Sequence, residues 1–449
     1  MRALCFLFLP VLCLSALAAE KATTEFTLVD AQECRPRNGL PHVLEKAKST
    51  GAIVSGLGHP IKVAYLGGSI TAQAGWRTKT FAFLKKQFPE ANFQMINASV
   101  GGTGSDVGVF RLQQDVLAYE PDLLFIEFAV NDGDLPPQQI IRYMEGIVRQ
   151  TWKAFPTCDI CFIYTIGRGH TADLVQGKFP ISASAMEKVA DFYGIPSIHL
   201  GLEVARLDKE GRILWRAPLP KTDEEKAALG DKIAYSADNV HPHPETGHMI
   251  FMDAFKRSWP EIVKASTNKE PYTLSKPLDE KNYEAARIAP ISKAKFSPGL
   301  KCENLAEDKD EELRDYARRM PTVVKLTKPG QFISFRFKGT HVAIYDIIAP
   351  YTGKVAVTLD KGPPKIFTRF DSYSDKPRVN YFTIAADLPD AIHEVKIELI
   401  AEKVDKAKIL SERKITIDKP QVYAPHYFYP GSLHYFYPGS LLVKGEILP

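Results

Sequence analysis

Three polar residues, far apart in the sequence, have the types that acyl-transfer chemistry requires. Ser69 ends a glycine-rich stretch, Gly67-Gly68-Ser69, that follows an apolar run. Asp238 and His241 lie three residues apart in a turn, so the carboxylate can hold the tautomer of the imidazole and stabilise its charged form. That imidazole could then take the proton of the Ser69 hydroxyl, which would make the serine a nucleophile.

Two further stretches could stabilise the negative charge that develops when a serine attacks a carbonyl. One follows a second apolar run and holds Gly101, Gly102 and Gly104, where a backbone N–H could meet the charge without a side chain in the way. The three glycines compete for this role, Gly104 least strongly. The other stretch contains Asn131, whose side-chain amide is a donor of the same kind.

Each of these stretches also has a simpler interpretation. Gly-Gly-Ser is common in plain turns and in loops that hold a phosphate, although a P-loop would need a lysine before the hydroxyl residue. Asn131 stands where Asn and Asp are frequent turn residues, and we expect Asp132 to be a structural hydrogen-bonding residue. Trp76 and Arg77 either line the pocket or simply begin a helix.

His243 and His248 are rivals of His241 for the role of general base. We expect His243 to cap the last helix of its domain and His248 to lie inside that helix. The three could instead form a metal site through His241-x-His243. Pro242 and Pro244 favour a polyproline-like backbone of period three, in which residues two apart need not face the same way, so we expect no metal.

The candidate residues lie at the ends of short apolar runs that alternate with helical patterns. The runs are Ile61–Leu66, Phe93–Asn97, Leu123–Phe128, Ile160–Thr165 and Pro196–His199. The helical patterns are Thr78–Gln87, Asp106–Tyr119, Pro137–Ala154, Ala183–Tyr193 and Pro244–Ser258. This alternation predicts a parallel α/β sheet with right-handed crossovers. The carboxyl ends of its strands meet at the edge where open α/β sheets bind ligands.

The last third of the chain has a different period. Apolar residues alternate with polar ones, as in Ile333-Ser334-Phe335-Arg336-Phe337, and turn residues separate such runs. This pattern predicts an antiparallel β-sandwich with one wet face per sheet. The predicted organisation is a signal peptide (1–19), an N-terminal arm (20–60), an α/β domain (61–268), a Pro- and Lys-rich linker (269–300) and the β-sandwich (301–449).

The first residues have the features of a secretory signal peptide. Arg2 is followed by the apolar run Leu4–Leu14 and by small residues up to Ala19. A membrane anchor is the alternative, but the run is short for a bilayer. We therefore expect a periplasmic or secreted protein. A net charge of +4 in 449 residues has no dominant sign, which argues against a nucleic-acid-binding protein.

The cysteines beyond the predicted signal peptide are Cys34, Cys158, Cys161 and Cys302, whose pairing the sequence leaves open. Cys158-x-x-Cys161 has the spacing of a redox motif or of half a metal site. It also begins an apolar run that indicates a buried strand, and no second C-x-x-C follows, so we favour the strand. The segment His426–Leu433 is repeated at His434–Leu441. We interpret the repeat as a tandem duplication in a tail or edge strand, with an aromatic ligand platform as the alternative.

Together, the four chemical stretches resemble the four sequence blocks of the SGNH/GDSL hydrolases over roughly residues 60–265. A serine follows the first strand, a glycine the second and an asparagine in x-x-Asn-Asp the third, and Asp-x-x-His stands near the end of the domain. The family's Gly-Asp-Ser is Gly67-Gly68-Ser69 here, and its Gly-x-Asn-Asp begins with Ala129. Neither departure removes a group that does chemistry.

The resemblance implies a flavodoxin-like three-layer α/β/α domain and serine esterase activity that needs no cofactor. It implies Ser69 as the nucleophile, His241 as the general base and Asp238 as the acid that orients it. It also implies an oxyanion hole made of the backbone N–H groups of Ser69 and Gly102 and the side-chain amide of Asn131.

An exported esterase with a β-sandwich behind it resembles carbohydrate esterases that remove O-acetyl groups from polysaccharides. In those enzymes the accessory sandwich is similar to galactose-binding-like or jelly-roll modules. No lid-like amphipathic helix is evident, so a long-chain lipase is less favoured. We therefore expect an acetylated carbohydrate as the substrate. The alternatives are a lipolytic or thioester hydrolase of the same fold, and a glycan-binding protein that no longer turns over.

Overall fold

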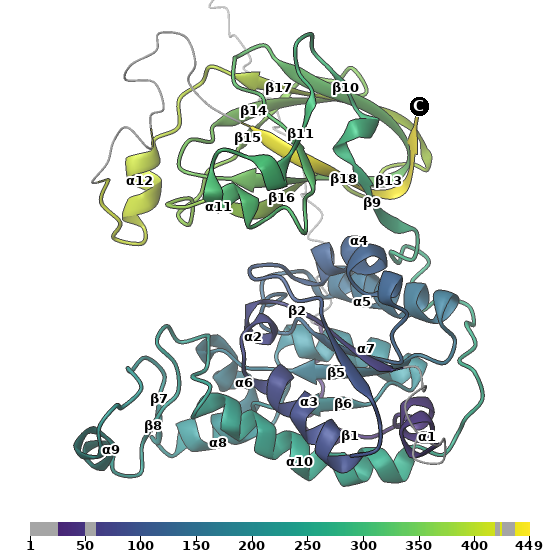
Figure 1. Cartoon of the computed structure of the whole chain (residues 1–449), viewed down its shortest axis with the longest axis vertical. Coiled ribbons are helices and arrows are strands. Elements are labelled where there is room, and N and C mark those ends of the chain that lie inside the picture. Colours follow the sequence, from purple (N-terminus) through teal and green to yellow (C-terminus); the bar gives the residue numbers. More distant parts are fainter. Residues whose placement is uncertain (1–25, 50–59, 418–422, 424–435) are drawn as a thin grey trace, which may run out of the picture.

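The computed structural model describes residues 26–49, 60–417, 423 and 436–449. The predicted signal peptide and the first copy of the repeated segment lie outside these residues. Figure 1 shows an α/β domain below and a β domain above it. In the described part of the chain, no helix has both the length and the apolar character that a membrane span requires.

Five parallel strands form the centre of the α/β domain, in the order β3-β2-β4-β5-β6. They are β2 (Ile61–Gly67), β3 (Phe93–Asn97), β4 (Leu123–Glu127), β5 (Asp159–Tyr164) and β6 (Ser197–His199). This is the strand order of flavodoxin-like sheets, and the predicted fold is confirmed. β4 and β5 are buried along their whole length, because helices cover both faces of a parallel sheet.

The predicted N-terminal arm adds two elements to this domain. β1 (Cys34–Arg35) pairs antiparallel with β6, which makes the sheet mixed rather than purely parallel. α1 (Pro41–Ser49) turns Val43 and Leu44 into the core. A strand of two residues is too short to produce a hydrophobic period, so no sequence pattern indicates it.

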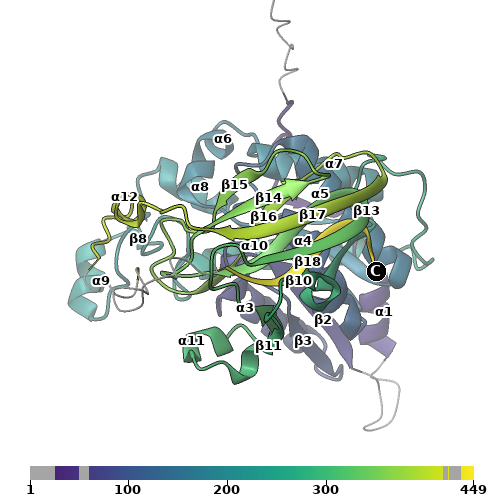
Figure 2. The ribbon, with the colours of Figure 1, turned by 90° about the horizontal axis from the view of Figure 1, so that it is seen from above.

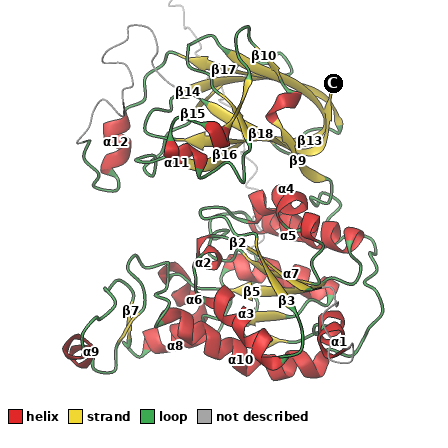
Figure 3. Ribbon diagram, in the orientation of Figure 1, coloured by secondary structure: helices red, strands yellow, loops and turns green. Residues whose placement is uncertain are grey.

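Helices α4, α5 and α7 lie on one side of the sheet, and α3 and α10 lie on the other (Figures 1 and 3). The long helices are α3 (Trp76–Gln87), α4 (Ser105–Asp115), α5 (Pro137–Ala154), α7 (Ile181–Tyr193) and α10 (Gly247–Ala265). The shorter ones are α2 (Ser69–Ala72), α6 (Thr171–Val175), α8 (Leu202–Lys209) and α9 (Asp223–Leu229). The helix predicted to begin at Pro244 begins at Gly247, because residues 244–246 form a turn. A parallel strand pair, β7 (Ile213–Leu214) and β8 (Ile233–Ala234), and α9 form a projecting arm.

The strands of the β domain all pair antiparallel, and β13 (Phe332–Ile348) is central to them. The first half of β13 pairs with β17, the second half pairs with β16, and β18 runs along most of its length. The other strands are β9 (Ala286–Pro290), β10 (Lys295–Phe296), β11 (Cys302–Asn304), β12 (Thr322–Val324), β14 (Lys354–Leu359), β15 (Lys365–Thr368), β16 (Arg378–Ala385), β17 (Ala391–Ile400) and β18 (Tyr437–Leu448). Helices α11 (Glu311–Arg314) and α12 (Lys406–Ser411) lie between strands.

Two of these strands shorten the linker predicted over residues 269–300. β9 pairs with β18 and β10 pairs with β13, so both belong to the β domain. β9 is an edge strand that contains Pro290, and proline is tolerated at an edge because one side of the strand needs no partner. Pro290 and Arg287 hide the alternating pattern that identifies the other strands.

The second half of β13 is buried on both faces. Val342 and Ile344 belong to the core of the β domain, whereas Ala343 and Tyr345 belong to the cluster that continues into the α/β domain. Figure 2 shows the β domain lying over the α/β domain. The prediction of one wet face per sheet is therefore wrong for this half, because that face packs against the other domain.

The Cys158-x-x-Cys161 stretch forms part of the core, as the strand interpretation predicts. Cys161 lies within β5 and Cys158 directly before it, and both side chains are buried. Burial raises the pKa of both thiols well above the ordinary value. The four cysteines among the described residues are free thiols.

Candidate active site

Ser69 stands at the carboxyl edge of the parallel sheet. β2 ends at Gly67 and α2 begins at Ser69, so the serine is the first residue of a short helical turn. β2 lies between β3 and β4, where the strand order reverses direction, and open α/β sheets bind ligands at such a point. As the first residue of α2, Ser69 has a backbone N–H without an acceptor in its own helix.

The structure brings Ser69, His241 and Asp238 together. His241 Nε2 is 2.7 Å from Ser69 Oγ, and His241 Nδ1 is 2.6 Å from Asp238 Oδ2. The other carboxylate oxygen, Oδ1, accepts the backbone N–H groups of Val240 at 3.0 Å and of His241 at 2.8 Å. The Asp-x-x-His turn is therefore closed by its own carboxylate, which fixes the imidazole relative to the backbone.

Hydrogen bonds set the charge state of Asp238. Partial burial acts to raise its pKa, but the backbone and ring of His241 and the N–H of Val240 outweigh this effect and hold the pKa below the ordinary value. The side chain of Asp238 is 51% exposed, so water screens the ion pair. A carboxylate that stays ionised holds the proton on Nδ1 and leaves Nε2 to face the serine as an acceptor.

Neighbouring segments fix the turn that carries these residues. Asn239 has a φ of +74°, a left-handed conformation that asparagine tolerates better than most residues. Its N–H donates to Ser236 Oγ at 2.8 Å, and its carbonyl accepts the N–H of Arg168 at 3.0 Å. The turn is thus tied to its own base and to the segment that follows β5.

Asn131 lies directly against Gly68. A Cβ added to Gly68 would stand 2.0 Å from Asn131 Oδ1 and 2.7 Å from its Cγ. No side chain fits at position 68 while the Asn131 amide stays where it is.

The three candidate glycines have different neighbours. A Cβ on Gly101 would be 3.6 Å from Ser69 Cβ, so this glycine and the peptide that carries the Gly102 N–H lie beside the serine. Gly102 has a φ of +73°, which other residues rarely adopt. Gly104 faces elsewhere, because a Cβ there would be 2.2 Å from Asp132 Oδ1.

The rival histidines have partners of their own. His243 Nε2 is 2.9 Å from the carbonyl of Ala217, and the N-cap of α10 is Thr246, so the prediction that His243 caps this helix is wrong. His248 lies inside α10 as predicted, and its Nδ1 accepts the N–H of Trp76 at 3.0 Å. Burial lowers the pKa of His248 to about 3, so the ring is neutral.

Arg111 links two of the loops at the site, and the sequence did not single it out. It lies in α4, is 1% exposed, and pairs with Asp115 at 2.9 Å. Its guanidinium also donates to the carbonyl of Gly67 at 3.3 Å and to the carbonyl of Ala98. It therefore ties the end of β2 to the loop that follows β3. An arginine in an amphipathic helix normally indicates a solvated face, so the sequence carried no signal for this role.

Glu127 stabilises the short helix α2, which begins at Ser69. It ends β4, is buried, and accepts the hydroxyls of Thr71 at 2.7 Å and Thr165 at 2.8 Å. Trp76 Nε1 donates to Thr71 Oγ1 at 3.2 Å, and Arg77 Nε donates to Thr71 O at 2.8 Å. Trp76 and Arg77 thus begin α3 and brace α2. A glutamate at the end of an otherwise apolar strand was the one available sequence signal.

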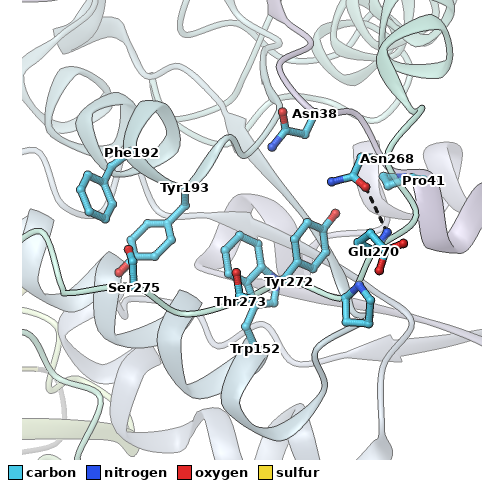
Figure 4. Close-up of a pocket in the computed structure, with 11 residues that line it drawn as sticks. Asn38, Pro41, Trp152, Phe192, Tyr193, Asn268, Glu270, Tyr272, Thr273 and Ser275 are labelled. Carbon is cyan, nitrogen blue, oxygen red and sulfur yellow. Dashed lines mark hydrogen bonds between the residues drawn. The ribbon is translucent and has the colours of Figure 1, made fainter.

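A separate cavity of about 220 Å³ lies at the other edge of the sheet (Figure 4). The ends of α5 and α7 and the chain that follows α10 line it, and these helices end where β5 and β6 are about to begin. Trp152 and Tyr272 stack on each other there, with ring centroids 4.3 Å apart. None of the predicted site residues lines this cavity.

Residues 65–247, from β2 through the Asp-x-x-His turn, match the sequence model of the GDSL-like lipase/acylhydrolase family. The α/β domain is therefore similar to this family over most of its length and has the SGNH hydrolase fold. A comparison with curated proteins found no match.

The two-domain structure is similar to that of a two-domain esterase (CEX) active on acetylated mannans. The crystal structure of that esterase with mannopentaose matches with a TM-score of 0.65 and 19% identity, over 93% of this chain and 100% of the other. A second crystal structure of a two-domain esterase (CEX) active on acetylated mannans matches with the same score and identity, over 92% and 99%. Similarity at this level of identity shows a shared fold.

Proposed function

We propose that this protein is a serine esterase that hydrolyses short acyl esters, acetyl esters foremost, on a carbohydrate. The observation that carries the proposal is the series of contacts from Ser69 Oγ to His241 Nε2 at 2.7 Å and from His241 Nδ1 to Asp238 at 2.6 Å. A hydroxyl, a base and the carboxylate that orients the base are the parts of an activated nucleophile.

In the proposed reaction, His241 Nε2 takes the proton from Ser69 as its oxygen attacks the ester carbonyl. Asp238 stabilises the imidazolium that results. The negative charge on the tetrahedral intermediate meets the N–H groups of Ser69 and Gly102 and the amide of Asn131. Removal of one such donor typically costs ~3–4 kcal/mol of transition-state stabilisation.

The imidazolium then passes its proton to the leaving alcohol, and the acyl group stays on Ser69 Oγ as an ester. Water attacks this acyl-enzyme with His241 again acting as the base, and collapse of the second intermediate releases the acid and restores the serine. The chain's own residues supply every proton transfer. We assign these steps to the α/β domain, residues 61–268.

Two findings support an acetylated carbohydrate as the substrate. The α/β domain matches the sequence model of a family of lipases and acylhydrolases. The arrangement of an SGNH domain with a following β domain is shared with an esterase active on acetylated mannans, over 93% of this chain. Export directed by residues 1–19 would place the enzyme where polysaccharides are met.

The test is acetate release from a panel of acetylated polysaccharides, with hydrolysis of p-nitrophenyl esters of increasing chain length beside it. We expect wild-type activity that is highest on acetyl esters and falls in Ser69→Ala by at least about 10⁴-fold. Ser275→Ala, at the cavity on the opposite edge, is the matched control and should keep full activity.

Three results would contradict the proposal in different ways. Equal activity of Ser69→Ala and wild type would show that Ser69 is not the nucleophile. A preference for long acyl chains would favour a lipolytic enzyme of the same fold. Glycan binding without hydrolysis of any ester would favour a binding protein that no longer turns over.

A further inference from the structure

Two side chains of the β domain end on the segment that precedes and begins α4. We call residues 98–106 the glycine loop, since it contains the three candidate glycines. The hydroxyl of Tyr381, in β16, donates to the carboxylate of Asp106. Arg319 Nη2 donates to the carbonyl of Ser99 at 3.1 Å. The β domain thus holds the glycine loop at both of its ends.

Asp106 connects the Tyr381 contact to the segments that carry the proposed reacting groups. The carboxylates of Asp106 and Asp132 both face Gly104, 3.0 Å and 2.2 Å from the position that a Cβ there would take. Asp132 Oδ1 also accepts the N–H of Ser105 at 2.9 Å. Since Asp132 directly follows Asn131, the Tyr381 contact reaches both segments that carry the proposed oxyanion donors.

The glycine loop is largely buried, but its first residues border a cavity on the side of the β domain. Residues 97–100 and, from the β domain, Arg318, Arg319 and Pro321 line a cavity of about 160 Å³, and Arg319 donates across it to Ser99. A loop bordered by empty space has fewer fixed neighbours than a loop in a close-packed core. On this side, the hydrogen bonds from Tyr381 and Arg319 hold the loop in addition to the packing and hydrogen bonds it has within the α/β domain.

We infer that the β domain positions the oxyanion hole, and that Tyr381, through Asp106, is the positioning residue. The inference rests on the proposed function and extends it. The hydroxyl of Tyr381 touches neither substrate nor nucleophile. It holds Asp106 against Gly104 and Asp132, which keeps the Gly101–Gly102 peptide and the Asn131 amide aligned on one carbonyl oxygen.

The inference is tested with Tyr381→Phe, which removes the hydroxyl and keeps the ring. An oxyanion donor acts in the transition state, so its misplacement lowers kcat and leaves the KM nearly unchanged. We expect kcat on p-nitrophenyl acetate to fall about 10- to 100-fold, the range expected when reacting groups are displaced by ~1 Å or less. The KM should stay within about twofold, since the interactions made by the ground state remain.

Tyr316→Phe is the matched control. Tyr316 is half-buried in the same domain, and its hydroxyl donates to the carbonyl of Pro377 at 2.7 Å, away from the glycine loop. It should lose as much thermal stability as Tyr381→Phe and keep the wild-type kcat. If the two variants lose kcat equally, or if Tyr381→Phe keeps the wild-type kcat, the inference is wrong.

Further variants keep the inference testable whether or not Tyr381→Phe folds. Should Tyr381→Phe not fold, Arg319→Met, which acts on the same loop, must show the same fall in kcat at constant KM, and an unchanged kcat there overturns the inference. Where Tyr381→Phe does fold, the pair Tyr381→Phe and Asp106→Asn should be non-additive, because both changes remove one contact. An active wild type whose activity depends on Ser69 but not on Tyr381 would overturn this inference alone, whereas an inactive wild type would end both proposals.

Discussion

Gly68 offers the sharpest test of the site, because the structure leaves no room for a side chain there. Replacement by alanine adds a Cβ that would lie 2.0 Å from Asn131 Oδ1. Ordinary van der Waals contact begins at 3.4 Å, so the amide oxygen has to move by about 1.4 Å. The backbone at Gly68 has a φ of −89°, outside the left-handed region that favours glycine, so we expect the clash with Asn131 to be the main effect.

The size of the effect follows from that displacement. A shift of ~1 Å in a group aligned with the reacting atoms costs about 10²-fold in rate. Complete loss of one oxyanion donor costs about 10²- to 10³-fold in kcat. We therefore expect Gly68→Ala to lower kcat by about 10²- to 10³-fold, close to the effect of Asn131→Ala. The KM should change little, because the donor acts mainly on the charge of the transition state.

The assay is a double-mutant cycle on p-nitrophenyl acetate with Gly68→Ala, Asn131→Ala and the double variant. If the alanine at position 68 acts by displacing Asn131, the double variant is no slower than Asn131→Ala alone. Gly169→Ala, where an added Cβ meets nothing within 4 Å, is the control for a glycine-to-alanine change near the site. Full additivity of the two losses, or a Gly68→Ala enzyme with the wild-type kcat, would refute the reasoning.

Two other predictions concern the carboxylates. Asp238→Asn should lower kcat by about 10²- to 10⁴-fold at constant thermal stability, because an amide no longer holds the imidazole in the tautomer that accepts the serine proton; an unchanged kcat would contradict the role of Asp238. Burial raises the pKa of Asp106 to about 6 from an ordinary 3.8, against the effect of backbone hydrogen bonds, and Asp132 and Tyr381 are its neighbours. The protonated Asp106 therefore adds at most about 3 kcal/mol to the free energy of unfolding. This contribution is complete below about pH 3.8 and is lost as the pH rises through 6. Urea denaturation at about pH 4.5 and pH 7.5 should therefore show wild type losing stability relative to Asp106→Asn, and a constant difference between the two would contradict it.

The sequence predicts those parts of the site that depend on local order along the chain. Ser69 and Asn131 follow apolar runs, and the ends of adjacent parallel strands necessarily meet at one edge. Asp238 and His241 are close because they share one turn. The start of α10 was wrong by three residues, since Pro244 satisfies the rules for a first helical position and for a turn equally well. The choice among glycines also needed the structure, since only the neighbours of each glycine distinguish them.

The supporting residues have no comparable local signal. Arg111 and Glu127 act through backbone carbonyls and hydroxyls of other elements, and Tyr381 acts from a domain whose first strand begins more than 150 residues after β4 ends. Their identity depends on which helix or strand faces the site, and this is settled by packing rather than by pattern. By our proposals, the four sequence blocks supply the reacting groups, and residues outside these blocks affect the rate. A chain that kept Ser69 and His241 but lost Tyr381 would match the family equally well, and by our inference it would be a slower esterase.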